Sequence, residues 1–259
     1  MTDRRVYKKM TADPSGSEVL YGIHPVRAAL EAGRRTVKRL FCVDSRKHNR
    51  RREQIIRLAE KGGLPVEYLT TAGLDKIAGS TGHQGLAAEV SGYPLVEPEE
   101  VLAAGRPGYP AFILVIDGVV DPHNLGALAR TAACVGVDGI IITKNNAVGP
   151  TPAVSKTSAG AIEFLTLARA TNLVRTIDFF KKKGIWVAGL DAAGQQTLYE
   201  SDLAGPLALV VGGEEKGMRQ LVRRHCDFVA AIPQAGAVSS LNVSVAGGIA
   251  MYEVFRQRL

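Results

Sequence analysis

Cysteine is scarce in this 259-residue sequence, and the three cysteines, Cys42, Cys134 and Cys226, stand far apart without a CxxC pair. An odd, scattered set indicates neither a disulfide framework nor a cysteine zinc site. No run approaches the roughly 20 apolar residues that a membrane-spanning helix needs, and the first ten residues are too polar for a secretory leader. We therefore expect a protein of the reducing cytoplasm, with neither a metal nor a membrane as its partner.

Several common catalytic signatures are missing as well. There is no GxGxxG turn, because the first apolar strand of the C-terminal half runs into Asp117-Gly118-Val119-Val120 instead. This absence disfavours a nicotinamide-dependent oxidoreductase. GxxxxGK[ST], GxSxG and HExxH are absent too, which disfavours phosphate-loop enzymes, hydrolases and metalloproteases. The histidines at 24, 48, 83, 123 and 225 show no ligand-like spacing.

Positive charge is present, but it is unevenly distributed. The net charge is +7, and residues 1–60 alone hold fifteen Lys/Arg against seven Asp/Glu, so the remainder sums to about −1. Clustered cations attract polyanions, because binding releases the counterions of the phosphates. The alternative is a solvated basic face that only keeps the protein soluble. The densest run supplies the candidate RNA contacts, which are Arg46, Lys47, Arg50, Arg51 and Arg52.

The N-terminal half is expected to form a small α/β/α domain over residues 18–92, after a flexible basic arm at 1–17. Apolar patterning predicts helices near 24–30 and 50–61, and strands at 40–43, 66–69 and 86–90. Residues 93–110 contain four prolines and three glutamates, a composition typical of a linker.

Residues 111–259 predict a mostly parallel sheet with helices on both faces, because continuous apolar strands alternate with helical segments. Ligands of such sheets bind beyond the carboxyl ends of the strands. The expected strands are 112–117, 139–143, 185–190, 207–212 and 228–232, and the expected helices are 124–135, 151–158, 172–183, 214–223 and 242–257.

Three polar blocks follow these strands, and the first is Asn124-x-Gly126-x-x-x-Arg130. Asn124 is a plausible helix N-cap. Arg130 is a lone cation in a helix of small apolar residues, which is costly unless an anion meets it. The alternative is an arginine whose head reaches solvent at the helix edge.

The second and third blocks are rich in glycine and hydroxyl groups. Gly212-Gly213-Glu214 would let the backbone approach a ligand closely, although a tight turn explains it equally well. Ile232-Pro233 leads into Ser240-Leu241-Asn242, where Ser240 or Asn242 could cap the last helix. An ordinary capped helix is the alternative for this block.

In this order, Asn124-x-Gly126-x-x-x-Arg130, Gly212-x-Glu214-x-x-Gly217 and Ile232-Pro233 with Ser240-Leu241-Asn242-Val243-Ser244 resemble the three motifs of the SpoU/TrmH class of SPOUT RNA methyltransferases. The resemblance covers residues 111–259. Residues 18–92 look like the L30e-like RNA-binding domain of many members, and bacterial 23S ribosomal RNA guanosine 2′-O-methyltransferases are the most similar group.

The resemblance implies a C-terminal trefoil knot, S-adenosylmethionine bound within it, a homodimer and methyl transfer to a ribose 2′-hydroxyl of RNA. It implies that Gly212, Ile232 and Leu241 contact the cofactor. It further implies that Arg130 is the principal catalytic residue, and that Asn124, Glu214, Ser240 and Asn242 shape the site, which the partner subunit completes. Glu215 departs from the family, where a small residue is common.

Other functions remain open at this point. Within the family, a transfer RNA ribose methyltransferase or an antibiotic-resistance ribosomal methyltransferase fits the same blocks. A non-enzymatic RNA-binding module would account for the basic N-terminal half, but it has no use for Arg130 or for the segment around Ser240.

Overall fold

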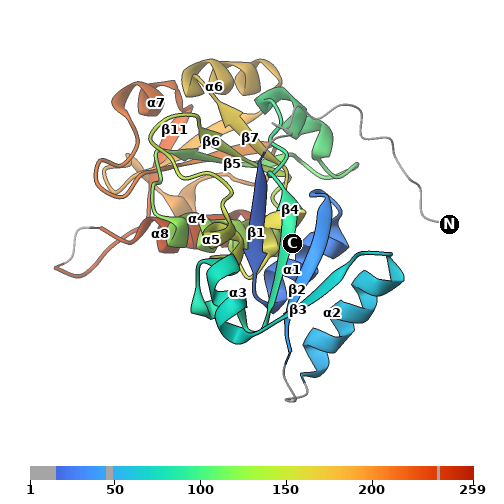
Figure 1. The fold of residues 1–259 in the computed structure, drawn as a ribbon. Coiled ribbons are helices and arrows are strands. Elements are labelled where there is room, and N and C mark those ends of the chain that lie inside the picture. Colours follow the sequence, from blue (N-terminus) through green and yellow to red (C-terminus); the bar gives the residue numbers. More distant parts are fainter. Residues whose placement is uncertain (1–15, 45–48, 238–239) are drawn as a thin grey trace.

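A computed structural model describes residues 16–44, 49–237 and 240–259. The chain forms two halves, each built around its own β-sheet (Figure 1). Most of the predicted basic arm and two candidate RNA contacts, Arg46 and Lys47, lie outside the described residues. Within the described ranges, no helix has the length and apolarity to cross a membrane.

The N-terminal half is a four-stranded sheet in the order β1-β4-β2-β3, in which β2 and β3 are parallel and the other pairs are antiparallel. The predicted α/β/α layering is observed. Leu40 and Ile55 belong to the core under α1 and α2, whereas Phe41 and Leu74 belong to the core under α3. Its elements are β1 (Ser17–Tyr21), α1 (Ile23–Ala32), β2 (Val37–Val43), α2 (Arg50–Lys61), β3 (Val66–Leu69), α3 (Thr71–Ala78), η1 (Thr81–His83) and β4 (Leu86–Ser91).

The C-terminal half is a seven-stranded sheet in the order β7-β6-β5-β10-β8-β11-β9, and all of its described strand pairs are parallel. This confirms the predicted parallel sheet. The strands are β5 (Phe112–Asp117), β6 (Gly139–Thr143), β7 (Leu167–Ala170), β8 (Trp186–Leu190), β9 (Gln196–Thr197), β10 (Leu207–Gly212) and β11 (Phe228–Ala231). The helices are α4 (Pro122–Val135), α5 (Pro152–Thr157), α6 (Leu173–Lys182), α7 (Gln220–His225) and α8 (Val243–Gln257), with short 3₁₀ turns η3 (Ala161–Phe164) and η4 (Leu198–Glu200).

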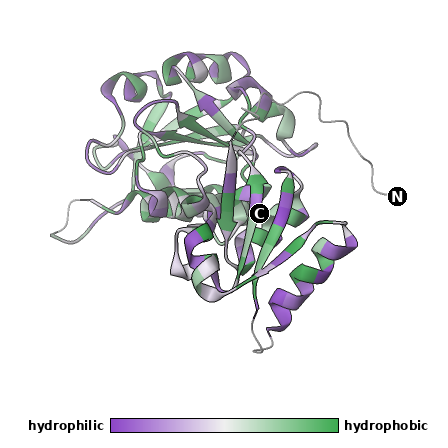
Figure 2. Ribbon diagram, in the orientation of Figure 1, coloured by the Kyte–Doolittle hydropathy of each residue, from purple (hydrophilic) through white to green (hydrophobic). Residues whose placement is uncertain are grey.

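Helices cover both faces of this sheet, which is why its strands are continuously apolar (Figures 1 and 2). Leu114 and Ile116 pack in the core beneath α4, α5 and α8, which we call the α4 face. Ile113 and Val115 point the other way, into the core beneath α6 and α7, which we call the α6 face. Alternate residues of each strand thus bury opposite sides of the sheet.

The segment between the halves runs along the large sheet. Tyr93 is buried, and its hydroxyl lies within hydrogen-bond distance of the carbonyl oxygens of Ile162 and Leu165, which share its one proton. Val96 forms a bridge with Ala168 of β7, and η2 (Pro98–Ala104) follows. The segment therefore packs on the edge of the C-terminal sheet over much of its length.

One predicted helix is wrong in extent. The sequence predicts a helix over 214–223, but α7 begins only at Gln220. Gly213 and Gly217 instead pair with each other, each donating its N–H to the other's carbonyl at 3.2 and 3.1 Å. Gly217 has a φ of +62°, which favours glycine and closes a tight turn.

Candidate active site

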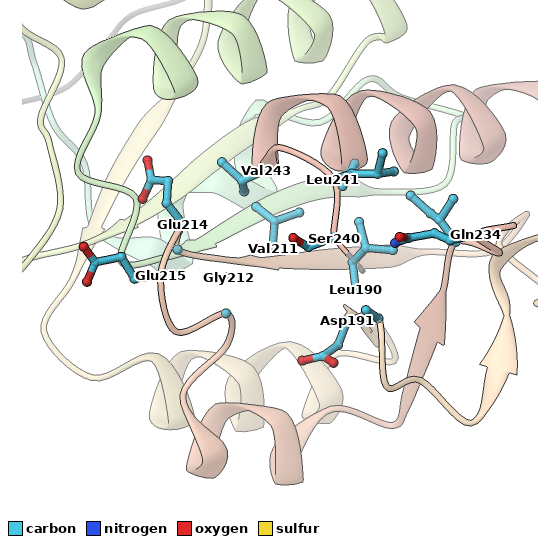
Figure 3. Close-up of a pocket in the computed structure, with 15 residues that line it drawn as sticks. Leu190, Asp191, Val211, Gly212, Glu214, Glu215, Gln234, Ser240, Leu241 and Val243 are labelled. Carbon is cyan, nitrogen blue, oxygen red and sulfur yellow. The ribbon is translucent and has the colours of Figure 1, made fainter. Parts of the chain in front are cut away.

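A cavity of about 280 Å³ lies at the carboxyl ends of β8, β10 and β11 (Figure 3). Three stretches far apart in the sequence form its wall: the end of β8, the turn after β10, and the segment from β11 into α8. This is where a parallel sheet is expected to bind a ligand. The lining residues are Leu190, Asp191, Ala192, Val211, Gly212, Gly213, Glu214, Glu215, Gly217, Ile232, Gln234, Ser240, Leu241, Val243 and Ala246.

All three residues predicted to contact the cofactor, Gly212, Ile232 and Leu241, line this cavity, as do Glu214 and Ser240. Gly212 is in very close contact with the turn that follows it. A Cβ atom at this position would stand 2.1 Å from the carbonyl carbon of Gly217 and from the backbone nitrogen of Met218. Glycine is therefore required here for β10 and its turn to pack together.

A chain of hydrogen bonds connects the three sequence blocks. The Asn242 amide donates to Oδ1 of Asn124 at 3.0 Å, and the Asn124 amide donates to Oε1 of Glu214 at 2.8 Å. Asn242 comes from the start of α8, Asn124 from α4 and Glu214 from the turn after β10. The predicted site residues Asn124, Glu214 and Asn242 thus form one cluster beside the cavity.

Asn124 holds a different position from the one predicted. The N-cap of α4 is Asp121, whose carboxylate accepts from the His123 N–H, and Pro122 begins the helix. Asn124 instead lies buried in the first turn, where it orients Glu214 and Asn242. The prediction for α8 is confirmed, because Asn242 caps that helix and accepts from the Ser244 and Val245 N–H groups.

Glu214 is held as a carboxylate. Its partial burial acts to raise the pKa, but hydrogen bonds from Asn124 and from the backbone at 120, 121 and 214 outweigh burial and lower the pKa below its ordinary value. The Val120 and Asp121 N–H groups approach the two carboxylate oxygens at 3.4 and 3.3 Å. A negative charge is therefore maintained next to the cavity.

Two further acids support the cavity, and sequence reasoning missed both. Asp117, at the end of β5, is 2% exposed and accepts from the backbone and Nε of Arg219 at 2.9 and 2.7 Å. It therefore anchors the far end of the turn after β10. Asp191 lines the cavity and pairs with Arg223 of α7 at 3.0 Å. The only signal in the sequence is that Asp117 is the last residue of an apolar strand and that Asp191 directly follows one.

The chemistry of the lining suits S-adenosylmethionine. The aliphatic side chains around Val211, Leu241 and Val243 offer apolar surface to an adenine ring, and Ser240 and Gln234 offer hydrogen bonds. Three carboxylates and no lysine, arginine or histidine line the described wall, which favours a ligand that carries positive charge. Among the described residues, no cluster of His, Cys, Asp and Glu could hold a metal ion.

Arg130 lies apart from the cavity within a single chain. It is exposed on α4 and is not one of the lining residues.

The helix α8 packs against α4 and leaves several of its own apolar side chains exposed. Val245 is 49% exposed, Tyr252 53% and Phe255 37%. Leu241, which lines the cavity, continues this stripe of exposed apolar residues, which we call the α8 stripe.

The described candidate RNA contacts do not line this cavity but lie on the first turn of α2, in the N-terminal half. Arg50 and Arg51 are exposed and Arg52 is half-buried. Asn49 caps the helix by accepting from the backbone N–H groups of Arg51 and Arg52. Ile55 and Ala59 face the core, so Arg50 and Arg51 lie on the solvent side of α2. Arg52 lies on the same side of the helix as Ile55 and Ala59, and its Nη1 is 2.9 Å from the position of a Cβ atom at Gly85.

Comparison with known proteins finds matches over both halves. Residues 111–252 match the SpoU rRNA Methylase family, and residues 19–96 match the family described as RNA 2′-O ribose methyltransferase substrate binding. The chain is 41% identical, over 93% of its length and 97% of the relative's, to the 23S rRNA (guanosine-2′-O-)-methyltransferase RlmB of Pseudomonas putida. It is 47% identical, over 80% of its length and 83% of the relative's, to YacO of Bacillus subtilis, which carries only a TrmH-family tRNA/rRNA methyltransferase designation.

Among solved structures, the SpoU methyltransferase AviRb from Streptomyces viridochromogenes in complex with AdoMet has the same fold. It aligns with a TM-score of 0.79 at 23% identity, covering 94% of this chain and 91% of AviRb.

Proposed function

The chain belongs to the SpoU rRNA methylase family, so it is an RNA methyltransferase, and we propose that it methylates the ribose 2′-hydroxyl of a guanosine in 23S ribosomal RNA with S-adenosylmethionine as donor. The observation that carries the proposal is the convergence of the Asn242–Asn124–Glu214 chain on the cavity at the ends of β8, β10 and β11. The RlmB relatives, aligned over nearly the whole chain, support the ribosomal guanosine.

We assign donor binding to the cavity, with Gly212, Ile232 and Leu241 in contact with S-adenosylmethionine. When bound, this cofactor supplies a sulfonium methyl group, which is already a strong electrophile. The protein's task is then to align the attacking ribose oxygen with that methyl group and to exclude competing geometries. Asn124, Glu214, Ser240 and Asn242 would fix the turn and the α8 start that border the reacting groups.

Arg130 is our candidate for the group that meets the ribose hydroxyl. A hydroxyl must lose its proton during attack, so it needs a base or a donor that stabilises the developing alkoxide. A guanidinium is protonated at any accessible pH, which favours stabilisation of the alkoxide and of a neighbouring phosphate. Proton removal by Arg130 in the loaded site is the second version of the mechanism.

We propose a homodimer in which the α8 stripe is covered by a second copy. Exposed Val245, Tyr252 and Phe255 support this interface, because isolated monomers rarely leave contiguous apolar surface on one helix. A twofold interface there would bring Arg130 of one subunit toward the cavity of the other. This arrangement would account for the position of Arg130 outside the cavity of its own chain.

The remaining assignments follow the family. We propose that residues 18–92 form an L30e-like RNA-binding domain, 93–110 the linker and 111–259 the catalytic domain with a trefoil knot. The return of the chain from β11, beyond β8, to α8 beside α4 is consistent with a threaded crossing. We propose a cytoplasmic enzyme, because the proposed substrate is ribosomal RNA.

The test is to map 2′-O-methyl groups on ribosomal RNA from cells that lack the protein, and to restore the missing one with purified enzyme and S-adenosylmethionine. Loss of one 23S guanosine methylation supports the proposal. Loss of a transfer RNA methylation would instead indicate a transfer RNA ribose methyltransferase. Loss of a ribosomal methylation that confers antibiotic resistance would indicate a resistance methyltransferase. Calorimetry in which S-adenosylmethionine does not bind would leave only an RNA-binding module.

A further inference from the structure

A second and larger cavity, of about 560 Å³, lies where the two halves meet. Its wall includes β1 and β4 ends of the N-terminal half and the carboxyl ends of β6 and β7 in the C-terminal half. We call it the junction cavity. The lining residues are Gly16, Glu18, Gly92, Tyr93, Leu95, Val96, Glu97, Lys144, Gly149, Pro150, Thr151, Arg169 and Thr171.

Two cations of the C-terminal half point into this space. Arg169 of β7 is in register with Ile142 of β6, which packs in the α4-face core, so Arg169 lies on the same face of the sheet. Lys144 is two residues beyond Ile142 and continues the same alternation. Both side chains are exposed, and neither has a hydrogen bond or ion pair with any described residue.

The acids of the junction cavity do not neutralise this pair. Glu18 is already in an ion pair with Arg35, which leaves Glu97 as the one uncompensated carboxylate of the described wall. Arg169 also lies close to bare backbone, because a Cβ atom at Gly149 would stand 3.3 Å from its Nη2. Unpaired cations, two threonine hydroxyls and accessible backbone are the groups that hold phosphate oxygens.

The junction cavity is linked to the active site by a continuous run of contacts. The loop after Lys144 passes Gly118, where a Cβ atom would stand 3.7 Å from the carbonyl oxygen of Asn146. The Val148 N–H then donates to the Val119 carbonyl at 2.9 Å. The next residue, Val120, donates to Glu214 beside the donor cavity. An RNA strand that ran along this loop would therefore pass from the junction cavity to the donor cavity.

We propose that Lys144 and Arg169 bind a backbone phosphate of the RNA substrate in the junction cavity, away from the methylated ribose. This rests on the proposed function for the identity of the ligand. A contact of this kind positions the strand without reading its sequence, because phosphates are the same at every nucleotide. It would let both halves of the chain hold one RNA at the same time.

The experiment compares Lys144→Ala/Arg169→Ala with the wild type by filter binding to transcribed 23S ribosomal RNA between 50 and 200 mM KCl. Each lost phosphate contact should lower the slope of log affinity against log salt by about 0.7–0.9, and affinity at the low-salt end should fall about tenfold or more. Lys182→Ala/Arg224→Ala is the matched control, since it removes two exposed cations from the α6 face. The control should keep the wild-type slope.

Equal slopes for the two double variants would overturn the proposal, whatever the enzyme methylates. Calorimetry with S-adenosylmethionine should give the wild-type affinity for Lys144→Ala/Arg169→Ala, which shows that the fold and the donor cavity are intact. If wild-type protein binds no S-adenosylmethionine, the proposed function fails while the salt slopes still test the junction cavity. Titration of the protein with inorganic phosphate in the absence of RNA tests the alternative, which is a site for free phosphate. Binding of inorganic phosphate under these conditions would contradict the proposal.

Discussion

Arg35 and Glu163 form an ion pair across the junction of the two halves, with Nε 2.9 Å from Oε2 and no exposed area on either side chain. Nη2 of Arg35 also donates to the Pro150 carbonyl at 3.0 Å, and its guanidinium lies 5.0 Å from the centre of the Tyr93 ring. Buried charges persist only when they are paired and hydrogen-bonded. The Arg35 side chain therefore holds the two halves in their relative orientation, and its removal would strongly destabilise the protein.

We predict that Arg35→Met destabilises the protein by about 3–5 kcal/mol, because it leaves the Glu163 carboxylate buried without its cation. Burial already raises the pKa of Glu163, against the opposing effects of Arg35 and Ser155. Urea unfolding at neutral pH measures the loss. The double variant Arg35→Met/Glu163→Leu should recover most of it, since apolar replacement of a whole buried pair is close to neutral. A double variant no more stable than Arg35→Met would contradict this account.

Much of the fold was predictable because it rests on local patterns. The strands at 112–117, 139–143 and 207–212 were predicted with the bounds that the structure has, since a strand buried on both faces is an uninterrupted apolar run. β7 was missed because it has four residues with Arg169 among them. α3 was missed because Gly73 interrupts a short, weakly patterned helix.

The site was predictable only in part, for a different reason. The blocks around Asn124, Glu214 and Asn242 were recognised by their resemblance to a family, and their spacing alone predicts no contact. The pairing of Asp117 with Arg219 spans 102 positions in the sequence. The pairing of Arg35 with Glu163 spans 128 positions. Such contacts depend on how the sheets are assembled, which no local periodicity encodes.

The pH dependence of Glu214 has a definite sign. Its folded-state pKa is lowered, so its contribution to stability is present above the ordinary carboxylate value of 4.5 and is lost as the pH falls through the lowered value. The free energy of unfolding of Glu214→Gln should therefore be below that of the wild type at pH 7, with the gap closing in acid. Chemical unfolding from pH 7 to pH 3 measures this gap. Glu215→Gln is the control, because Glu215 accepts no hydrogen bond from the described residues, and it should not show the acid-dependent gap.

Gly212→Ala should weaken S-adenosylmethionine binding at least tenfold in calorimetry. The added methyl group would overlap the Gly217–Met218 backbone at 2.1 Å, so the turn that lines the cavity must move away. Overpacking of this kind costs about 1–3 kcal/mol, and a lower melting temperature should accompany it. Gly205→Ala is the control, because nothing lies within 4 Å of a Cβ atom there. Unchanged donor affinity in Gly212→Ala would mean that the turn does not contact the cofactor.

The α8 stripe predicts that Tyr252→Asp produces monomers. A charge placed at the centre of an apolar interface has no partner and opposes association, whereas the same charge on a free surface has little effect. Light scattering after size exclusion gives the mass directly. Leu221→Asp on α7 is the matched control, since Leu221 is 57% exposed on the α6 face, and it should leave the dimer intact. If both variants remain dimeric, the subunits associate through another surface.

Arg130→Ala should retain S-adenosylmethionine binding and lose methyl transfer by a factor of at least about 10², the scale of a removed transition-state donor. Its exposure outside the cavity further predicts that it serves the partner subunit's site. Refolding Arg130→Ala together with Gly212→Ala, assayed at a donor concentration too low to load the Gly212→Ala cavity, should then restore about a quarter of the wild-type activity, because half of the randomly formed dimers would hold one intact site out of two. In such a dimer, the intact cavity of one subunit meets the intact Arg130 of the other. Mixtures that stay inactive, although mixed dimers form, would place Arg130 in the site of its own chain. Donor affinity lost together with activity in Arg130→Ala alone would instead assign the residue a structural role.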